Sequence, residues 1–125
     1  MTKRSISTDS APPPGGAYSQ AIEARGLVFL AGQGPFDASG DKIDGSFADE
    51  ARQTFQNLAA IAAAAGGSLA DAVRVGVYLR DMGNFPLMNE IYSEFFSDPL
   101  PARTTIQSNL PGFGIEVDAV LSLED

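Results

Sequence analysis

Apolar residues recur along this chain with two different periods, and these periods mark out the expected secondary structure. Strict alternation of apolar and polar residues is typical of strands. The expected strands, the first of them a short edge strand, are residues 3–7, 18–24, 27–31, 72–80, 102–108 and 114–123. In residues 72–80 the alternation places Val73, Val75, Val77 and Leu79 on one face. Arg25-Gly26 is expected to turn between the second and third strands and so make a hairpin.

Spacing of three and four residues predicts two helices. Ser46 and Asp49 form a capping-box pattern at the start of the first helix, which Gly66-Gly67 is expected to end. Asn84 is expected to cap the second helix, which ends before Pro99. The phenylalanines at helical spacing are expected to be core residues: Phe47, Phe55, Phe85, Phe95 and Phe96.

This order of elements predicts an α+β fold. Two helices of this length can cover only one face of the sheet, so we expect a mixed β-sheet with two helices packed on one face. The second face is expected to be partly polar, as in a subunit interface. It should carry Arg74, Tyr78, Arg103 or its neighbours, Glu116 and Asp118, mixed with Val120 and small residues.

Composition limits both the size of the protein and its chemistry. The 125 residues, 44% of them hydrophobic, suit one domain over residues 1–125. Cysteine, histidine and tryptophan are absent. Nucleophiles of the Ser/His/Asp and Cys/His types and zinc sites of Cys and His are therefore excluded. The sequence also lacks a calcium loop of the DxDxDG type, so we predict no metal.

Charge bears on the possible partners. Sixteen acidic against eight basic residues give a net charge of −8, which repels nucleic acid and anionic lipid, so neither is expected as a partner. The polar first ten residues do not resemble a signal peptide. The longest apolar run, residues 58–65, is shorter than the roughly 18 residues of a membrane span. We therefore expect a cytoplasmic protein.

Several short blocks are more specific than the periodicity. They are GAYSQ at 16–20, AGQGP at 31–35, NEIY at 89–92 before Phe95-Phe96, and PARTT at 101–105 before Leu110-Pro111 and 115–117. In order and number, from about residue 6 to 121, they resemble the RidA/YjgF family of enamine/imine deaminases. The resemblance implies a chorismate-mutase-like fold, a homotrimer with active sites between subunits, and no cofactor. It also implies hydrolysis of 2-imino acids, such as 2-iminopropanoate derived from 2-aminoacrylate, to 2-keto acids and ammonia.

The resemblance also implies roles for residues. Arg103 matches the arginine that binds the substrate carboxylate, which suits the two parallel hydrogen bonds of a guanidinium. Glu116 matches the glutamate that positions or deprotonates water. Tyr18 completes the catalytic set. The implied substrate-binding residues are Arg103, Thr105, Asn89, Gly32 and Ala31. We expect the side chains of Arg103 and Glu116 to share one cleft, brought together by adjacent strands.

Other interpretations of these residues remain open. In these interpretations Arg103 forms a surface ion pair, Glu116 is a solvated carboxylate on a strand, and Tyr18 packs in a subunit interface. Ala17 and Ala31 replace the proline and serine usual in the family, and Thr105 stands where many members have cysteine; these departures bear on substrate range more than on reaction class. The alternative function is a non-catalytic module of the same fold that binds small carboxylates or another protein. The ribonuclease label of some relatives fits an acidic chain without histidine poorly.

Overall fold

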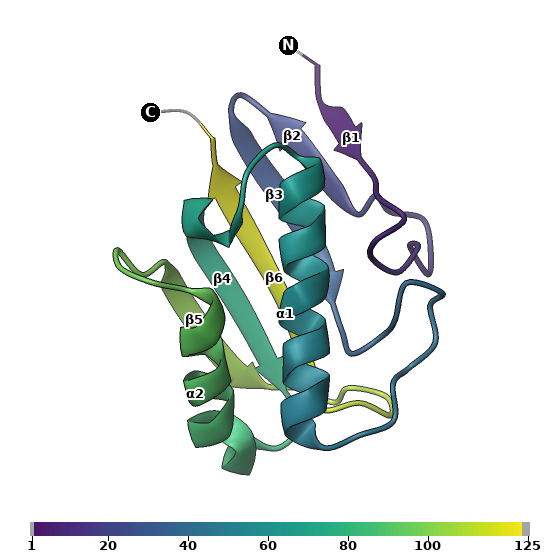
Figure 1. The fold of residues 1–125 in the computed structure, drawn as a ribbon, viewed down its shortest axis with the longest axis vertical. Helices are drawn as coiled ribbons and strands as arrows, with labels where there is room; N and C mark the ends of the chain where they lie inside the picture. The colour runs from purple at the N-terminus through teal and green to yellow at the C-terminus, as the bar shows by residue number, and fades with distance from the viewer. Residues whose placement is uncertain (1, 124–125) are drawn as a thin grey trace.

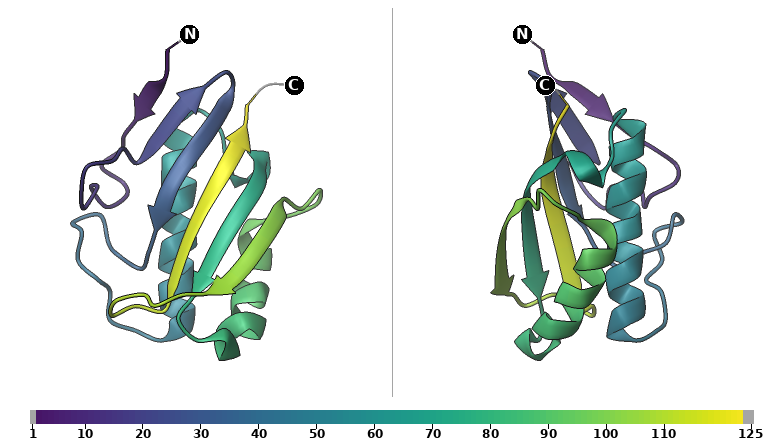
Figure 2. Two further views of the ribbon diagram at one scale, coloured as in Figure 1. Left: turned by 180° about the vertical axis from the view of Figure 1, so that it is seen from behind. Right: turned by 60° about the vertical axis from the view of Figure 1, so that its left-hand side comes forward.

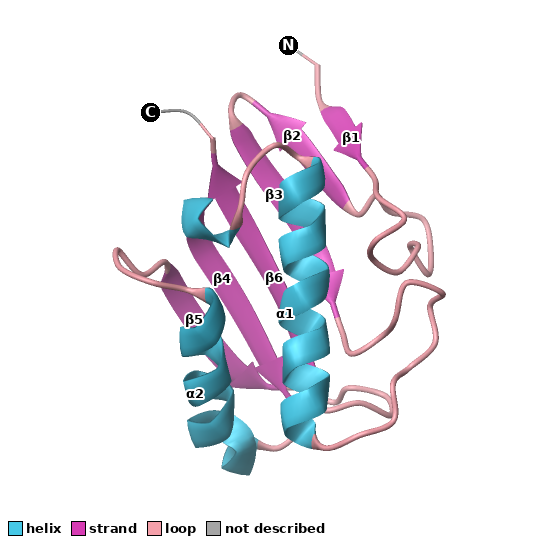
Figure 3. Cartoon of the chain, viewed as in Figure 1, coloured by secondary structure: helices cyan, strands magenta, loops and turns pink. Residues whose placement is uncertain are grey.

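The computed structural model describes residues 2–123, which form a sheet and two helices (Figures 1 and 3). The strands are β1 (Arg4–Ile6), β2 (Ala21–Ala24), β3 (Leu27–Gln33), β4 (Ala72–Leu79), β5 (Ala102–Gln107) and β6 (Ile115–Ser122). The helices are α1 (Phe47–Ala64) and α2 (Phe85–Phe95). Short 3₁₀ turns, Leu69–Asp71 and Met82–Asn84, precede β4 and α2. The predicted strands and helices are thus confirmed, with shifts at some ends.

The sheet has the strand order β1-β2-β3-β6-β4-β5. Strands β4 and β5 run parallel, joined through α2, and the other neighbouring strands are antiparallel. Both helices lie on the same face of the sheet, which Figure 2 shows edge-on. The predicted α+β class, a mixed sheet with two helices on one face, is therefore confirmed. No described helix covers the other face.

Local signals at both ends of α1 set its length. Ser46 accepts a hydrogen bond from the Asp49 amide, and the Asp49 carboxylate accepts one from the Ser46 amide, completing the predicted capping box. At the other end Gly66 has a φ of +91°, and the amides of Gly66 and Gly67 donate to Ala63 and Ala62. This is a Schellman motif, in which glycine is favoured because the residue at this position has a positive φ. Among the described helices, none is long and apolar enough to cross a membrane.

The core lies between the helices and the sheet. Phe55 of α1 is fully buried and is in aromatic contact with α2 and the residue after it, with ring centres 5.2–5.9 Å from those of Tyr92, Phe95 and Phe96. The prediction of core phenylalanines is confirmed for Phe55 and Phe96, whereas the other three are partly buried and pack against the core from its edge. Valines and leucines of β4 and β6 form the sheet side of this core.

The predicted face of β4 is wrong at one residue. Val73 is 48% exposed rather than buried, because the pairing of β4 with β6 shifts register between Ala72 and Arg74. Ala72 is buried instead, and the alternation resumes at Val75. A bulge of this kind moves one side chain out of phase with its strand.

Two element boundaries also differ from the sequence prediction. Residues 18–20 are loop rather than strand, and β2 begins only at Ala21. The reason is that the Gln20 side chain bonds to the preceding loop, where its Oε1 accepts from the Thr8 amide at 2.7 Å. Asn84 makes no capping hydrogen bond to α2. Asp81 caps the preceding 3₁₀ turn instead, accepting from the Gly83 amide.

The uncovered face of the sheet is mixed in character, as predicted. Phe29 is 46% exposed and Ile106 is 48% exposed on it, and Val120 is paired between Phe29 and Arg74. Polar residues occupy neighbouring positions on the same face: Arg74, Tyr78, Thr104, Glu116 and Asp118. The prediction named Arg103 or its neighbours for this face, and it is the neighbour Thr104 that lies here, whereas Arg103 faces the helices.

Replacing Phe55 by alanine should lower the free energy of unfolding by about 3–5 kcal/mol, because it removes the ring that joins the two helices. Leu100→Ala is the control, since Leu100 is 59% exposed and its loss should change stability by about 0.5 kcal/mol or less. Urea unfolding of both variants at one fixed protein concentration measures the difference. Equal stability of the two variants would show that the core has been assigned wrongly.

Candidate functional site

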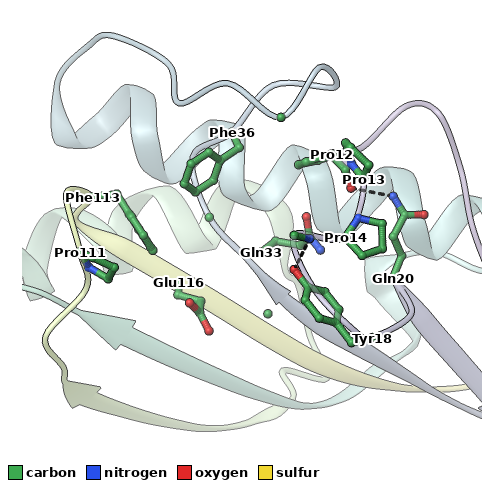
Figure 4. A pocket seen from close by; sticks show the side chains of 14 residues that line it. Pro12, Pro13, Pro14, Tyr18, Gln20, Gln33, Phe36, Pro111, Phe113 and Glu116 are labelled. Carbon is green, nitrogen blue, oxygen red and sulfur yellow. Dashed lines mark hydrogen bonds between the residues drawn. The ribbon is translucent and has the colours of Figure 1, made fainter.

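A pocket of about 520 Å³ opens at one end of the sheet (Figure 4). Three segments far apart in the sequence form it: the loop of residues 12–20, the end of β3 with the loop that follows it, and residues 111–116 at the start of β6. Glu116 is the only charged residue among the described residues that line it. Across residues 2–123, no group of three or more His, Cys, Asp or Glu side chains is placed to hold a metal ion.

Glu116 contributes a carboxylate to this pocket from an unusual environment. It is half-buried, and partial desolvation raises the pKa of the Glu116 carboxyl above its ordinary value, with a further contribution from the negative charge of Asp118 two residues along β6. A carboxyl with a raised pKa can both take up and release a proton closer to neutral pH. Glu116 therefore has the chemistry of a general acid and base.

The end of β3 is shaped to receive that carboxylate. The pairing of β3 with β6 shifts register between Leu30 and Gln33, so Ala31 and Gly32 lie in an irregular stretch. A Cβ atom added to Gly32 would lie 2.5 Å from Glu116 Oε2. A side chain here would displace the Glu116 carboxylate, whereas glycine lets it rest against the backbone in its present position. Ala31 lies next to this position, and its amide donates to the Gln20 carbonyl at 2.9 Å.

Tyr18 reaches the pocket from the first loop. Its side chain is 53% exposed, and its hydroxyl accepts a hydrogen bond from the Gly15 amide at 3.0 Å. The hydroxyl thus retains its own proton to donate to a ligand. Figure 4 shows Glu116 between Phe113 on one side and Tyr18 on the other.

Two buried amide side chains hold the loops that wall the pocket. Gln20 Nε2 donates to the carbonyls of Thr8 at 3.1 Å and Pro12 at 2.8 Å, which fixes the first loop. Asn57 of α1 donates from Nδ2 to the carbonyls of Gly34 at 3.1 Å and Phe36 at 2.8 Å. The sequence analysis did not single out Asn57. A lone amide within the apolar stripe of an alanine-rich helix was the signal that could have found it.

Arg103, Thr105 and Asn89 form a second cluster, away from the pocket. The Arg103 guanidinium carbon lies 4.6 Å from the ring centre of Tyr92 and 5.6 Å from that of Phe85, both on α2. These distances are typical of cation–π contacts. Asn89 is four residues after Phe85 and three before Tyr92, so it lies on the same stripe of the helix.

This second cluster contains polar groups without partners. Within residues 2–123, no carboxylate lies within ion-pair distance of Arg103. The hydroxyls of Tyr92 and Thr105 are buried and, among the described residues, have no hydrogen-bond partner. Burial raises the pKa of Tyr92, and the positive charge of Arg103 opposes that rise. A guanidinium that stacks on aromatic rings but has no carboxylate partner, with buried hydroxyls in the same cluster, is suited to receive an anion.

The two clusters do not meet within one chain. Arg103 pairs with Val75, whose side chain faces the helices, whereas Glu116 pairs with Tyr78 on the uncovered face. The expectation that adjacent strands bring Arg103 and Glu116 together is wrong, because β4 lies between β5 and β6. The pocket therefore brings together Tyr18, Gly32 and Glu116 of the predicted set, and leaves Arg103, Thr105 and Asn89 on the opposite side of the sheet.

Comparison with known proteins gives consistent matches over nearly the whole chain. The sequence model of a family described as Endoribonuclease L-PSP matches residues 8–122. The chain is 46% identical over 121 residues to a RutC family protein of Pyrococcus horikoshii, covering 94% of this chain and 96% of the relative. It is 38% identical over 125 residues to the 2-iminobutanoate/2-iminopropanoate deaminase of Dermatophagoides farinae, covering 98% of each.

Solved structures give the same result. RidA from the Antarctic bacterium Psychrobacter sp. superposes with a TM-score of 0.90 at 39% identity, covering 95% of this chain and 98% of that one. E. coli TdcF with bound serine superposes with a TM-score of 0.89 at 30% identity, covering 97% and 99%.

The raised pKa of Glu116 gives a testable dependence of stability on pH. A carboxyl whose pKa is higher in the folded than in the unfolded state stabilises the fold fully below the unfolded pKa, and this contribution is lost as pH rises through the folded pKa. Glu116→Gln should therefore be more stable than the parent at pH 7, with the difference disappearing as pH falls below about 4. Urea unfolding at several pH values measures it. A Glu116→Gln variant that is less stable at pH 7 would contradict the desolvated environment.

Proposed function

Since this chain belongs to the RidA/YjgF/RutC family, described as Endoribonuclease L-PSP, we propose that it is an enamine/imine deaminase that hydrolyses 2-imino acids to 2-keto acids and ammonia. The family includes imine deaminases, and the chorismate-mutase-like, YjgF-like fold predicted from the sequence is confirmed by its structural neighbours. The observation that carries the proposal is Glu116: a half-buried carboxylate with a raised pKa, seated over Gly32 at the edge of a pocket.

The proposal requires more than one copy of the chain. Glu116 and Arg103 lie on opposite faces of the sheet, so one chain alone cannot offer both to a substrate as small as 2-iminopropanoate. We propose a homotrimer in which Arg103 of the partner subunit reaches the Glu116 pocket. Exposed Phe29 and Ile106 on the uncovered face of the sheet support such an assembly, because closed cyclic symmetry would remove this surface from water.

In the proposed mechanism Arg103 binds the substrate carboxylate with two parallel hydrogen bonds from its planar fork. The Thr105 backbone and the Asn89 amide line this anion site. Glu116 holds a water molecule against the imine carbon and takes up one of its protons as the carbon–oxygen bond forms. That proton passes to the imine nitrogen, which gives a tetrahedral carbinolamine. The carbinolamine hydroxyl then gives up its proton, by way of Glu116, to the amine nitrogen as the carbon–oxygen double bond forms and the carbon–nitrogen bond breaks, so that ammonia leaves with the 2-keto acid. Tyr18 donates a hydrogen bond to the reacting groups.

The alternative from the sequence is a non-catalytic module that binds small carboxylates or a protein partner. It would use the same Arg103 site but would not need a Glu116 of raised pKa. The RNA cleavage named in the family's description is disfavoured by the net charge of −8 and the absence of histidine, and we predict no nucleic-acid partner. One measurement separates these functions: decay of 2-iminopropanoate, generated in situ by an amino-acid oxidase, with and without the protein.

Single substitutions should separate binding from proton transfer. Glu116→Gln should lower turnover of 2-iminopropanoate by roughly 10²- to 10⁴-fold while pyruvate still binds, because size and polarity are kept and the base is removed. Arg103→Lys should lower both binding and turnover, because it keeps the charge but loses the planar fork. Calorimetry with pyruvate and the in situ imine assay give the two readouts. Full turnover by Glu116→Gln would place water activation elsewhere in the pocket.

Mixing two inactive variants tests the shared site. If each site takes Glu116 from one subunit and Arg103 from another, then Arg103→Ala and Glu116→Gln chains refolded together in equal amounts should regain about a quarter of the parent activity, the fraction of sites with both native residues. Light scattering should give a trimer for each variant and for the mixture. A monomer by scattering, or trimers without regained activity, would contradict a site built from two subunits.

A further inference from the structure

Glu116 shares its face of the sheet with a second carboxylate, that of Asp118. The two residues are two positions apart on β6, so their side chains point to the same side. Both are partly buried, and within residues 2–123 neither forms an ion pair with a lysine or arginine. Two like charges so placed disfavour each other's ionised form, so the structure around them must hold each one in position.

Glycines on the two strands beside β6 make room for these carboxylates. A Cβ atom added to Gly32 of β3 would lie 2.5 Å from Glu116 Oε2. A Cβ atom added to Gly76 of β4 would lie 2.5 Å from Asp118 Oδ1. A glycine within a strand often marks such a close approach. Glu116 therefore lies against β3, at the pocket, whereas Asp118 lies against β4 on the other side of its own strand.

Tyr78 of β4 connects the two positions. It is paired directly opposite Glu116, and Gly76 is paired opposite Asp118. The Tyr78 hydroxyl donates to Asp118 Oδ2 at 3.1 Å, and it passes so close to Gly76 that an added Cβ atom there would lie 3.2 Å from it. Burial, together with this bond, raises the pKa of Tyr78, so the hydroxyl keeps its proton and remains a donor. The tyrosine thus orients Asp118 from a position beside Glu116.

The charged and titratable groups around Glu116 are few. On its own strand, Asp118 adds to the rise in the pKa of Glu116 that desolvation causes. On β4, Arg74 donates to the carbonyl of the next residue at 2.6 Å and to a threonine hydroxyl at 3.0 Å, rather than to either carboxylate. β3 and residues 111–114 contain no charged residue, and Tyr18 reaches the pocket from the first loop. Among residues 2–123, the charge that acts on Glu116 is therefore that of Asp118.

We propose that Asp118, held in place by Tyr78, is a positioning residue that keeps Glu116 basic enough to take a proton from water during imine hydrolysis. This inference rests on the proposed deaminase function. In the proposed trimer, Arg103 of the partner subunit would favour the ionised form of Glu116 and make it a weaker base. The negative charge of Asp118 opposes that effect. The bond from Tyr78 keeps Asp118 from turning to pair with the guanidinium itself.

The first test is the pH dependence of 2-iminopropanoate hydrolysis. Asp118→Asn keeps an oxygen that can accept from Tyr78 but removes the charge, so Glu116 should stay ionised to lower pH. On the acidic side of the profile this variant should retain about two- to fivefold more of its plateau activity than the parent does, and its plateau should be lower because a weaker base takes up the proton less readily. An acidic limb that does not move in Asp118→Asn would overturn the proposal.

The matched control for this test is Asp9→Asn. It makes the same chemical change at an exposed carboxylate outside the pocket lining, so it should keep the parent profile. A shift in this variant equal to that of Asp118→Asn would show a general effect of net charge and would overturn the specific role of Asp118.

Tyr78→Phe tests whether the tyrosine acts through Asp118. The ring is kept and the hydroxyl is lost, so Asp118 is no longer held, and the acidic limb should move in the same direction as in Asp118→Asn but less far. The double variant should have the profile of Asp118→Asn alone, because the charge through which Tyr78 acts is already gone. A parent profile in Tyr78→Phe, or additive shifts in the double variant, would overturn this role of Tyr78.

Carbon-13 NMR of the glutamate carboxyl groups separates failure of this inference from failure of the proposed function. The signal that is missing from Glu116→Gln identifies Glu116, and its titration gives the pKa of Glu116 without any substrate. A lower pKa in Asp118→Asn than in the parent and in Asp9→Asn supports the inference even if no imine is hydrolysed. An equal pKa of Glu116 in all three proteins overturns the inference and leaves the deaminase function standing.

Discussion

The alternation of side chains along a strand is the constraint on which the proposed site depends. Because successive residues point to opposite faces, Arg103 faces the helices while Thr104 faces the uncovered side, and the pairing of Glu116 with Tyr78 places Glu116 on that uncovered side too. No loop movement within one chain can bring a central-strand carboxylate through the sheet. The two charged groups can act on one small molecule only if two chains meet. The proposed reaction therefore depends on the proposed oligomer, because a single chain cannot offer both residues to one substrate.

The pocket itself depends on a different interaction, the bonding of loop carbonyls by buried amides. The walls are loops, whose backbone groups lack the regular partners of a helix or strand. Gln20 and Asn57 supply those partners, and both are almost fully buried. Gln20 donates to three carbonyls of one loop and Asn57 to two carbonyls of another. Buried polar groups are costly unless they are paired, so these two side chains commit their loops to one conformation. These two side chains therefore fix the loops that surround the candidate catalytic residues.

Most of the fold could be predicted because its signals are local. The capping box at Ser46, the glycines after α1 and the strict alternation of β4 depend on residues a few positions apart. Val73 could not be predicted, since the bulge that exposes it arises from pairing with β6, forty or more residues later. The same limit applied to the site. Its residues were found through short blocks of resemblance, but the separation of Arg103 from Glu116 follows from β4 lying between β5 and β6 and from the strand pairings that set their faces, which no local pattern indicates.

The net charge of the chain explains why the proposed anion site depends on short-range contacts, namely the stacking that holds Arg103 and the geometry of its hydrogen bonds. A chain with a net charge of −8 repels an anionic substrate at a distance, but salt at physiological strength screens that repulsion beyond about 8 Å. At short range, no carboxylate among residues 2–123 lies within ion-pair distance of the Arg103 guanidinium, and the rings of Tyr92 and Phe85 hold it in place. The same short range keeps Glu116 from repelling the substrate if the bound carboxylate points toward Arg103.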